Sequence, residues 1–115
     1  MTQLNVQALE ALDKANKTRI ARAADKRAIR NGDLDPVAVL MDPPEYWGSA
    51  KLVDLFLSMP RIGRQRANRW CTIEMVSPAR RLDALTERQR TMLGIHIDVW
   101  CRKRDALRVE MEEAA

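Results

Sequence analysis

The fold of this chain is decided by residues 51–89, which read KLVDLFLSMPRIGRQRANRWCTIEMVSPARRLDALTERQ. Near the start of this stretch, four apolar side chains recur at the spacing of one face of a helix over residues 50–59: Leu52, Leu55, Phe56 and Met59. Pro60 ends this helix, and a second helical run begins at Arg64. Between them lies Gly63, in a turn where glycine tolerates a positive φ or a close approach of the backbone. The stretch therefore predicts two helices joined by a tight turn.

The start of the second helix is suited to an anion. Its first backbone amides have no partner inside the helix, and together with the helix dipole they attract a group such as phosphate. Positive charge surrounds this position, because residues 61–81 hold six arginines and one acid, Glu74. The arginines are Arg61, Arg64, Arg66 and Arg69, then Arg80 and Arg81 after a second turn at Ser77-Pro78. We interpret this stretch as a polyanion-binding turn between helices.

The predicted helix over residues 64–75 separates its apolar side chains from its basic ones. Its inner face carries Ala67, Trp70 and Cys71. Its outer face carries Gln65, Arg66, Arg69 and Thr72. Arginines with a structural role would share the helical phase of Trp70, and these do not. The pattern therefore favours a binding role for them.

Two motifs in this stretch resemble those of a known family. Residues 59–70, MPRIGRQRANRW, have the proline, short glycine-containing turn and basic helix start of a helix-turn-helix signature, and residues 77–90, SPARRLDALTERQR, resemble a second signature with paired arginines. In this order and spacing they resemble the actinobacterial integration host factor family, small basic DNA-binding proteins with a helix-two-turns-helix domain. The resemblance extends over roughly residues 10–95. Where the family usually has Pro-Gly-apolar-Gly, this chain has Pro60-Arg61-Ile62-Gly63.

This resemblance implies a partner and a location. The partner is double-stranded DNA, and the protein is expected to associate with the nucleoid and to assist site-specific recombination, where a recombinase is a further candidate partner. The implied source is an actinobacterium or its bacteriophage.

The composition is that of a globular domain with segregated charge. The chain has 115 residues, of which 46% are hydrophobic and 31% charged, and its net charge is +4. Residues 14–30 hold seven Lys or Arg against Asp25. Such segregation suits nucleic acid or an anionic membrane surface. No apolar run approaches the roughly 18 residues that span a bilayer, so we expect a soluble cytoplasmic protein outside the membrane.

Residues 3–30 predict a long first helix. They contain neither proline nor glycine, and Asn31-Gly32 is a natural stop. Four bases fall in one stripe about 80° wide: Arg19, Arg22, Lys26 and Arg30. Past Ile20 the apolar residues are mostly alanine, which anchors a helix poorly, so we expect the helix to project from the body at least in part. We interpret it as a basic arm along a phosphate backbone; the alternative is a solvated helix without a partner.

A short helix is predicted after this arm. Asp35 is its N-cap, Pro36 its first residue, and Pro43-Pro44 ends it. Its inward residues are Val37, Leu40 and Met41. In the loop that follows, we expect Trp47 to pack beneath the loop rather than to stack on bases.

Two signals mark the end of the central region. Ser77-Pro78 predicts the start of a short fifth element, with Leu82 and Leu85 as its core contacts. Thr86 and Gln89 form a capping box for the last helix.

The last helix is predicted from Glu87 to about Glu113. Its apolar residues follow a near-heptad course: Leu93, Ile97, Trp100, Leu107 and Met111. Gly94 allows a close crossing with another helix. Beyond the core, the last residues could fold back, pair with another copy or hang free. The apolar positions 107 and 111 make contact with a partner, including self-association through this helix, one of the candidates.

Catalytic chemistry has no sequence signature here. The chain shows no nucleophile-base set, glycine-rich nucleotide loop or metal-ligand cluster. We therefore expect that the protein is not an enzyme and that it binds neither a metal nor a cofactor. Cys71 and Cys101 lie on apolar helical phases and predict buried free thiols. His96 is interpreted as a core or surface histidine.

These observations predict an all-α protein in three parts. Residues 1–32 form a basic N-terminal helix, residues 33–101 the helix-two-turns-helix domain, and residues 102–115 a C-terminal helical extension. The function we expect is non-enzymatic and architectural: largely sequence-independent binding of duplex DNA through phosphates and the minor groove, using Gly63 and the arginines around it. Two alternatives stay open, an RNA-binding module and a helical interaction protein that binds an acidic partner, for example a phage modulator of a host protein.

Overall fold

The computed structural model describes the backbone of residues 3–114 and the side chains of residues 5–114. The elements of this part are α1 (Gln3–Asn31), α2 (Pro36–Met41), the 3-10 helix η1 (Glu45–Trp47), α3 (Leu52–Ser58), α4 (Arg64–Ile73), the 3-10 helix η2 (Leu82–Ala84) and α5 (Glu87–Ala114). No strand occurs among these residues, although Lys51 and Arg81 form an isolated antiparallel bridge. The prediction of an all-α fold is confirmed.

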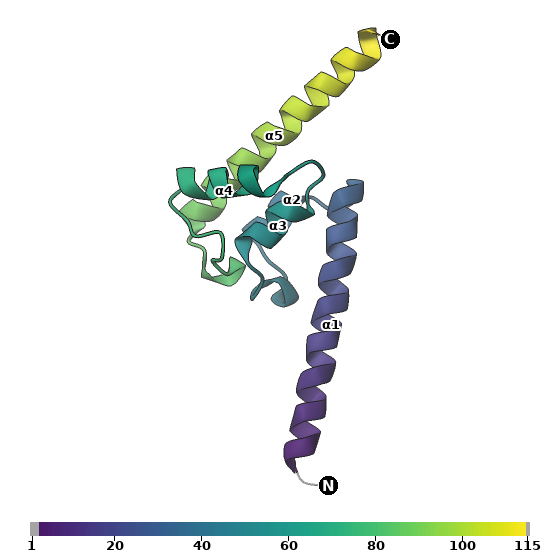
Figure 1. Ribbon diagram of the computed structural model, residues 1–115, viewed down its shortest axis with the longest axis vertical. Coiled ribbons are helices and arrows are strands. Elements are labelled where there is room, and N and C mark those ends of the chain that lie inside the picture. The colour runs from purple at the N-terminus through teal and green to yellow at the C-terminus, as the bar shows by residue number, and fades with distance from the viewer. Residues whose placement is uncertain (1–2, 115) are drawn as a thin grey trace.

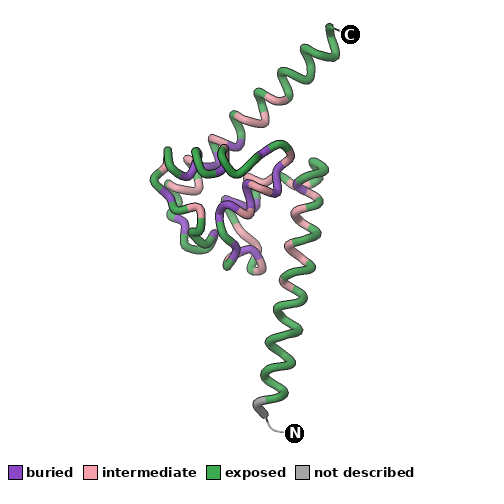
Figure 2. The backbone as a smooth tube through the Cα atoms, viewed as in Figure 1, coloured by how far each residue is buried: buried purple, intermediate pink, exposed green. Residues whose placement is uncertain are grey.

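Two long helices extend in opposite directions from a small helical body (Figure 1). As a result the molecule is elongated, with extents of 68 × 33 × 22 Å. Burial is concentrated in the body, whereas the first half of α1 and the last part of α5 are exposed (Figure 2). The expected projection of the first helix is therefore confirmed for its N-terminal half.

The core forms around the apolar face of α3. Its four predicted residues are all buried: Leu52, Leu55, Phe56 and Met59. On α4 the predicted inner residues are buried as well: Ala67, Trp70 and Cys71. The rings of Phe56 and Trp70 meet edge to face with centroids 5.3 Å apart, which fixes α4 against α3.

The short helix α2 begins as predicted. The Asp35 side chain accepts a hydrogen bond of 2.9 Å from the backbone N–H of Val37. Leu40 is fully buried, but the prediction for Met41 is wrong, because Met41 is 42% exposed and Val39 is buried instead. The reason is that α2 packs against both α3 and α5, so its inner face is centred on residues 39–40.

Gly94 lies where α5 crosses α2, as predicted. A Cβ at this position would lie 3.6 Å from Cγ1 of Val37 and 3.9 Å from Cδ2 of Leu40, at ordinary contact distance. An alanine would fit at this crossing, so the approach of the two helices does not require the glycine.

The C-terminal third of α1 is anchored to the body through the η1 loop. One oxygen of Asp25, Oδ2, accepts hydrogen bonds of 2.8 Å from both the hydroxyl of Tyr46 and the indole N–H of Trp47. Trp47 is fully buried, which confirms that it packs beneath the loop. Ile29 is also buried, so one isoleucine supplies the apolar anchor that the alanine-rich sequence did not indicate.

The first turn differs from the sequence prediction in its backbone. Arg61, not Gly63, has the positive φ, at 64°, whereas Gly63 is extended with φ −94° and ψ 173°. The chain reverses direction two residues earlier than expected, immediately after Pro60. The dihedral angles of residue 63 therefore do not require a glycine.

The second turn also corrects a prediction, because Ser77-Pro78 does not start a helix. The N–H of Arg80 donates to the carbonyl of Ser77 at 3.0 Å, and the 3-10 helix η2 begins only at Leu82. The physical reason is long-range: the carbonyls of Pro78 and Arg80 accept hydrogen bonds of 3.0 and 2.8 Å from the first amides of α3. These two carbonyls are consequently not available to accept the hydrogen bonds of a local helix. Leu82 and Leu85 are buried, as predicted.

The long helix α5 begins with the predicted capping box. The N–H of Gln89 donates to Oγ1 of Thr86 at 3.1 Å, and the N–H of Thr86 donates to Oε1 of Gln89 at 2.9 Å. Leu93 and Ile97 are buried in the body, whereas Leu107 and Met111 are 60% and 73% exposed. None of the described helices has the length and apolar character to cross a bilayer.

Candidate functional site

The N-terminus of α4 is open to solvent. Gly63 is its N-cap residue and is exposed, and no described side chain caps the helix. A Cβ built at Gly63 would meet no described atom within 4 Å. The positive end of the helix dipole and its first amides are thus accessible, and glycine leaves room for a bulky anion to approach the backbone.

Most arginines predicted around this helix start are exposed, namely Arg61, Arg64 and Arg69. The prediction that Arg66 lies on the outer face is wrong, because Arg66 is half-buried and its guanidinium carbon lies 3.9 Å from the centroid of the Trp100 ring. This cation–π contact joins α4 to α5 and fixes the position of one positive charge.

The second turn presents two further exposed arginines. Arg80 donates from Nε and Nη2 to the carbonyl of Ala84 at 3.4 and 3.3 Å. Arg81 pairs with Asp83 at 2.6 Å, and the side chains are 59% and 46% exposed. Such a solvated pair contributes little to stability and can be exchanged for another anion.

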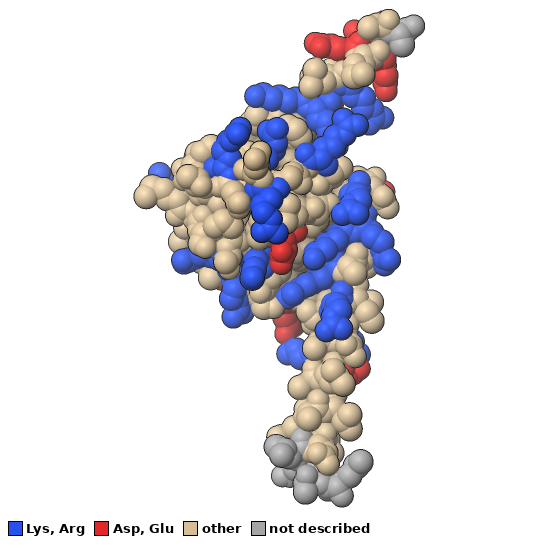
Figure 3. Space-filling model, in the orientation of Figure 1, with Lys and Arg blue, Asp and Glu red and all other residues tan. Residues whose placement is uncertain are grey.

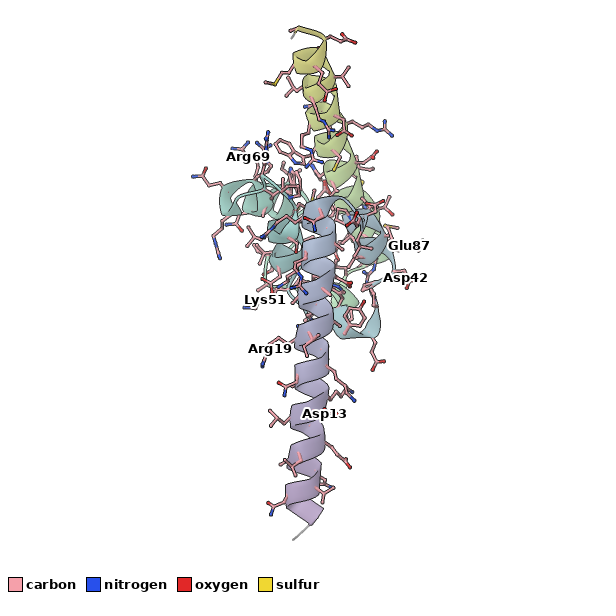
Figure 4. All side chains as sticks on the ribbon, turned by 90° about the vertical axis from the view of Figure 1, so that its right-hand side faces the viewer. Asp13, Arg19, Asp42, Lys51, Arg69 and Glu87 are labelled. Carbon is pink, nitrogen blue, oxygen red and sulfur yellow. The ribbon has the colours of Figure 1, made fainter. Side chains whose placement is uncertain are left out.

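The two turns lie at opposite ends of α3. The first turn follows the last residue of α3, while the second turn caps its first amides. In the view of Figure 4, Arg69, Lys51 and Arg19 point to one side, whereas Asp42 and Glu87 lie on the other. That basic side is the face shown in Figure 3, where Lys and Arg gather over α1, the body and α5.

Lys51 is a member of this face that the sequence prediction missed. It is exposed and is paired through its backbone with Arg81. Residue spacing gave no signal for it, because the bridge joins segments thirty residues apart.

The predicted basic stripe of α1 is only partly directed to solvent. Arg19 and Arg30 are exposed and Lys26 is half-buried. Arg22 instead donates to the backbone carbonyl of Tyr46 and to the hydroxyl of Ser49, so it holds α1 on the body.

Two open grooves border α1. One, of about 630 Å³, is lined on one side by the basic stripe and reaches Ser49. The other, of about 540 Å³, is lined by Lys14 and Lys17 of α1 and by Arg81 of the second turn. The arm and the second turn therefore face a common space.

Two charged residues for which the sequence indicated no role serve the fold. Arg90 donates to the carbonyl of Leu40 at 2.8 Å and to that of Leu82 at 2.6 Å, which ties α2 and η2 to α5. Glu74, the one acid between residues 61 and 81, lies 3.1 Å from Nε2 of His96. His96 also stacks on Trp70, which agrees with a structural role.

The cysteines are free thiols, as predicted. Cys71 is buried, and burial raises the pKa of its thiol to about 11. Cys101 was also predicted to be buried but is only half-buried, and this burial raises its pKa as well. In the described part of the chain, no group of His, Cys, Asp or Glu is arranged to hold a metal ion.

The fold and the basic face define a class: small all-helical proteins in which two tight turns flank a short central helix. No family model matches the chain. The integration host factors of Mycobacterium tuberculosis (strain ATCC 25618 / H37Rv) and Mycolicibacterium smegmatis (strain ATCC 700084 / mc(2)155) are each 35% identical to it over 85 residues, covering 72% of this chain and 81% of each relative. The chain belongs to the integration host factor family, as the sequence motifs predicted.

The fold has a counterpart among solved structures. The structure of sIHF bound to an 8-base-pair palindromic DNA superposes with a TM-score of 0.68 at 24% identity. The match covers 74% of this chain and 98% of that one.

Proposed function

We propose that this protein binds duplex DNA with little sequence preference and acts as an architectural protein of the nucleoid. The observation that carries the proposal is the exposed start of α4 at Gly63, which no described side chain caps and which exposed arginines flank in the chain. The DNA present in the sIHF structure and the family of the mycobacterial relatives support it.

In this mechanism the first turn holds one strand of the duplex. The amides that follow Gly63 donate to a phosphate, and Arg61, Arg64 and Arg69 add charge-assisted contacts beside it. Arg66, held over Trp100, supplies a charge that is already in position. Contacts of this kind, from backbone amides and guanidinium groups to phosphates, carry little base information.

The second turn and the arm extend the contact. Arg80 and Arg81 reach a second phosphate or the minor groove. Arg19, Lys26 and Arg30 of α1 lie along the backbone further on. Arg22 contributes indirectly, because it positions the arm.

The salt dependence of binding tests this mechanism. If about five phosphates are neutralised, log affinity should fall against log salt with a slope of about −4 to −5. In gel-shift titrations on a short random duplex, the double substitution Arg80→Ala/Arg81→Ala should flatten the slope by about two. Arg88→Ala, a substitution of an exposed arginine at the start of α5, serves as the control and should change the slope much less. Binding that ignores salt, or an Arg80/Arg81 variant that behaves like the unchanged protein, would contradict the mechanism.

The role we assign is non-enzymatic, in the bacterial cytoplasm, and includes assistance to site-specific recombination with a recombinase as partner. In a competition assay at equal salt, a preference for structured RNA over duplex DNA would argue for the RNA-binding alternative instead. Exposed Leu107, Val109 and Met111 favour one further candidate, contact of the C-terminal extension with a protein, including a second copy. Light scattering across a concentration series tests self-association.

A further inference from the structure

The last part of α5 forms a basic groove with the first turn. The groove has a volume of about 600 Å³ and is lined by Arg61 of the turn and by one face of the extension: Arg104, Leu107, Arg108, Met111 and Glu112. Three of these six side chains are arginines and one is an acid. The groove thus has positive charge beside the turn that precedes Gly63.

The groove continues the face of α5 that packs on the body. Leu93 and Ile97 are buried on this face, and Trp100 lies beneath the guanidinium of Arg66 one turn further on. At 3.6 residues per turn, Arg104 and Arg108 follow on the same face. Position 104 would be apolar if the face served packing alone, and it is instead the first of two bases directed toward the turn.

The charges in the groove are available to a ligand. Arg104 is half-buried, which restricts its motion, whereas Arg108 is 76% exposed. Arg108 pairs with Glu112 at 3.4 Å on the same helix, and this solvated pair costs little to exchange. Figure 3 shows basic side chains continuing from the body onto α5 on the face that carries Arg69, before acidic residues appear at the tip.

We propose that Arg104 and Arg108, together with Arg61, form an additional phosphate-binding site that carries the duplex from the first turn along the C-terminal extension. This inference rests on the proposed DNA binding and adds two residues to it. The three guanidinium groups contact the sugar-phosphate backbone, and Leu107 and Met111 line the floor of the groove without reading bases.

The test compares two double variants of the full chain. Arg104→Gln/Arg108→Gln removes both charges from the groove and keeps the helix propensity. Arg88→Gln/Arg102→Gln removes two charges from the same helix, and both positions lie about 160° around the helix from Arg104. Both control residues are exposed. Gel-shift titrations use two random duplexes. One is long enough to reach from the first turn past the C-terminal extension, and the other is too short to reach the extension from the first turn.

On the long duplex, the groove variant should bind about tenfold more weakly at low salt, with a slope flatter by about two, while the control stays close to the unchanged protein. On the short duplex, the groove variant should lose much less of its affinity. Equal losses in the two variants, or no loss in the groove variant while the unchanged protein binds DNA, would overturn the site. So would a groove variant that changes only the oligomeric state in light scattering, because the groove would then hold a second copy. Failure of the unchanged protein to bind duplex DNA would instead refute the proposed function.

Discussion

At the scale of single residues, the backbone of the two turns depends on left-handed positions. In the described part of the chain, Arg61 and Met75 are the non-glycine residues with positive φ, at 64° and 56°. Met75 ends α4 in the manner of a Schellman motif, since the N–H of Val76 donates to the carbonyl of Cys71 at 2.9 Å. α1 ends in the same way at Gly32, with φ 82°, where glycine avoids the strain.

The two strained positions allow stability and binding to be separated. Both Arg61→Gly and Met75→Gly should raise the free energy of unfolding by about 1 kcal/mol, because glycine adopts the left-handed region without a Cβ clash. Met75 is 91% exposed, so its removal costs little packing. Only Arg61→Gly should weaken DNA binding, because it also removes a charge from the interface. Urea denaturation and gel-shift titration of both variants give the comparison; equal binding by the two would exclude Arg61 from the interface.

The sequence pattern predicted the left-handed residue of the first turn at the wrong position, for a physical reason. Glycine was expected to take the left-handed position at 63, but the turn reverses two residues earlier and leaves that position to an arginine. The place of Gly63 is better explained by the open space at the start of α4.

At the scale of elements, the docking of α1 depends on the carboxylate of Asp25. Asp25→Ala would leave the hydroxyl of Tyr46 and the buried indole N–H of Trp47 without their acceptor, and should lower the free energy of unfolding by about 2–3 kcal/mol. Asp13→Ala is a control on the projecting part of the same helix, where Asp13 pairs with Lys17 in solvent, and should cost under about 0.5 kcal/mol. Chemical denaturation measures the free energy of unfolding of the two variants. Equal losses of stability would show that α1 is not anchored at Asp25.

The same contact has a pH signature. The hydrogen bond to Asp25 raises the pKa of Tyr46 above its ordinary value of 10.0, with burial and the charge of Asp25 acting in the same direction. Because the folded-state pKa is raised, this contact stabilises the fold fully below pH 10 and is lost as the pH rises through the folded pKa. Tyr46 is the single tyrosine of the chain, so the ultraviolet absorbance of its phenolate reports it directly. In the Asp25→Ala variant the titration should move to lower pH; an unchanged titration would rule out the contact.

Elements with local signals were predictable, and those held by distant contacts were not. The Asp35 cap, the Thr86–Gln89 capping box and the apolar face of α3 depend on residues within a few positions of each other. The second turn was misassigned because its carbonyls bind amides of α3, about 25 residues earlier in the chain. The structural role of Arg90 was not predictable for the same reason, since its carbonyl partners come from α2 and η2.

At the scale of the whole molecule, the account depends on one basic face assembled from separate segments. The sequence predicted the arginines of both turns, but it could not show that α3 separates the turns or that Arg69, Lys51 and Arg19 point to one side of the molecule (Figure 4). It also could not show that Arg22 turns into the body or that Lys51 joins the second turn. These placements follow from packing, and they determine which charges can meet one duplex.

Amide chemical shifts of the ¹⁵N-labelled protein during titration with a short duplex test this claim most directly. We expect the amides of Gly63, Arg64, Arg80 and Arg81 to shift along one common binding curve, because one duplex contacts both turns. Amides near Asp42 and Glu87, on the opposite side, should stay in place. Shifts centred on Asp42 and Glu87, or two turns that respond with different affinities, would contradict the account.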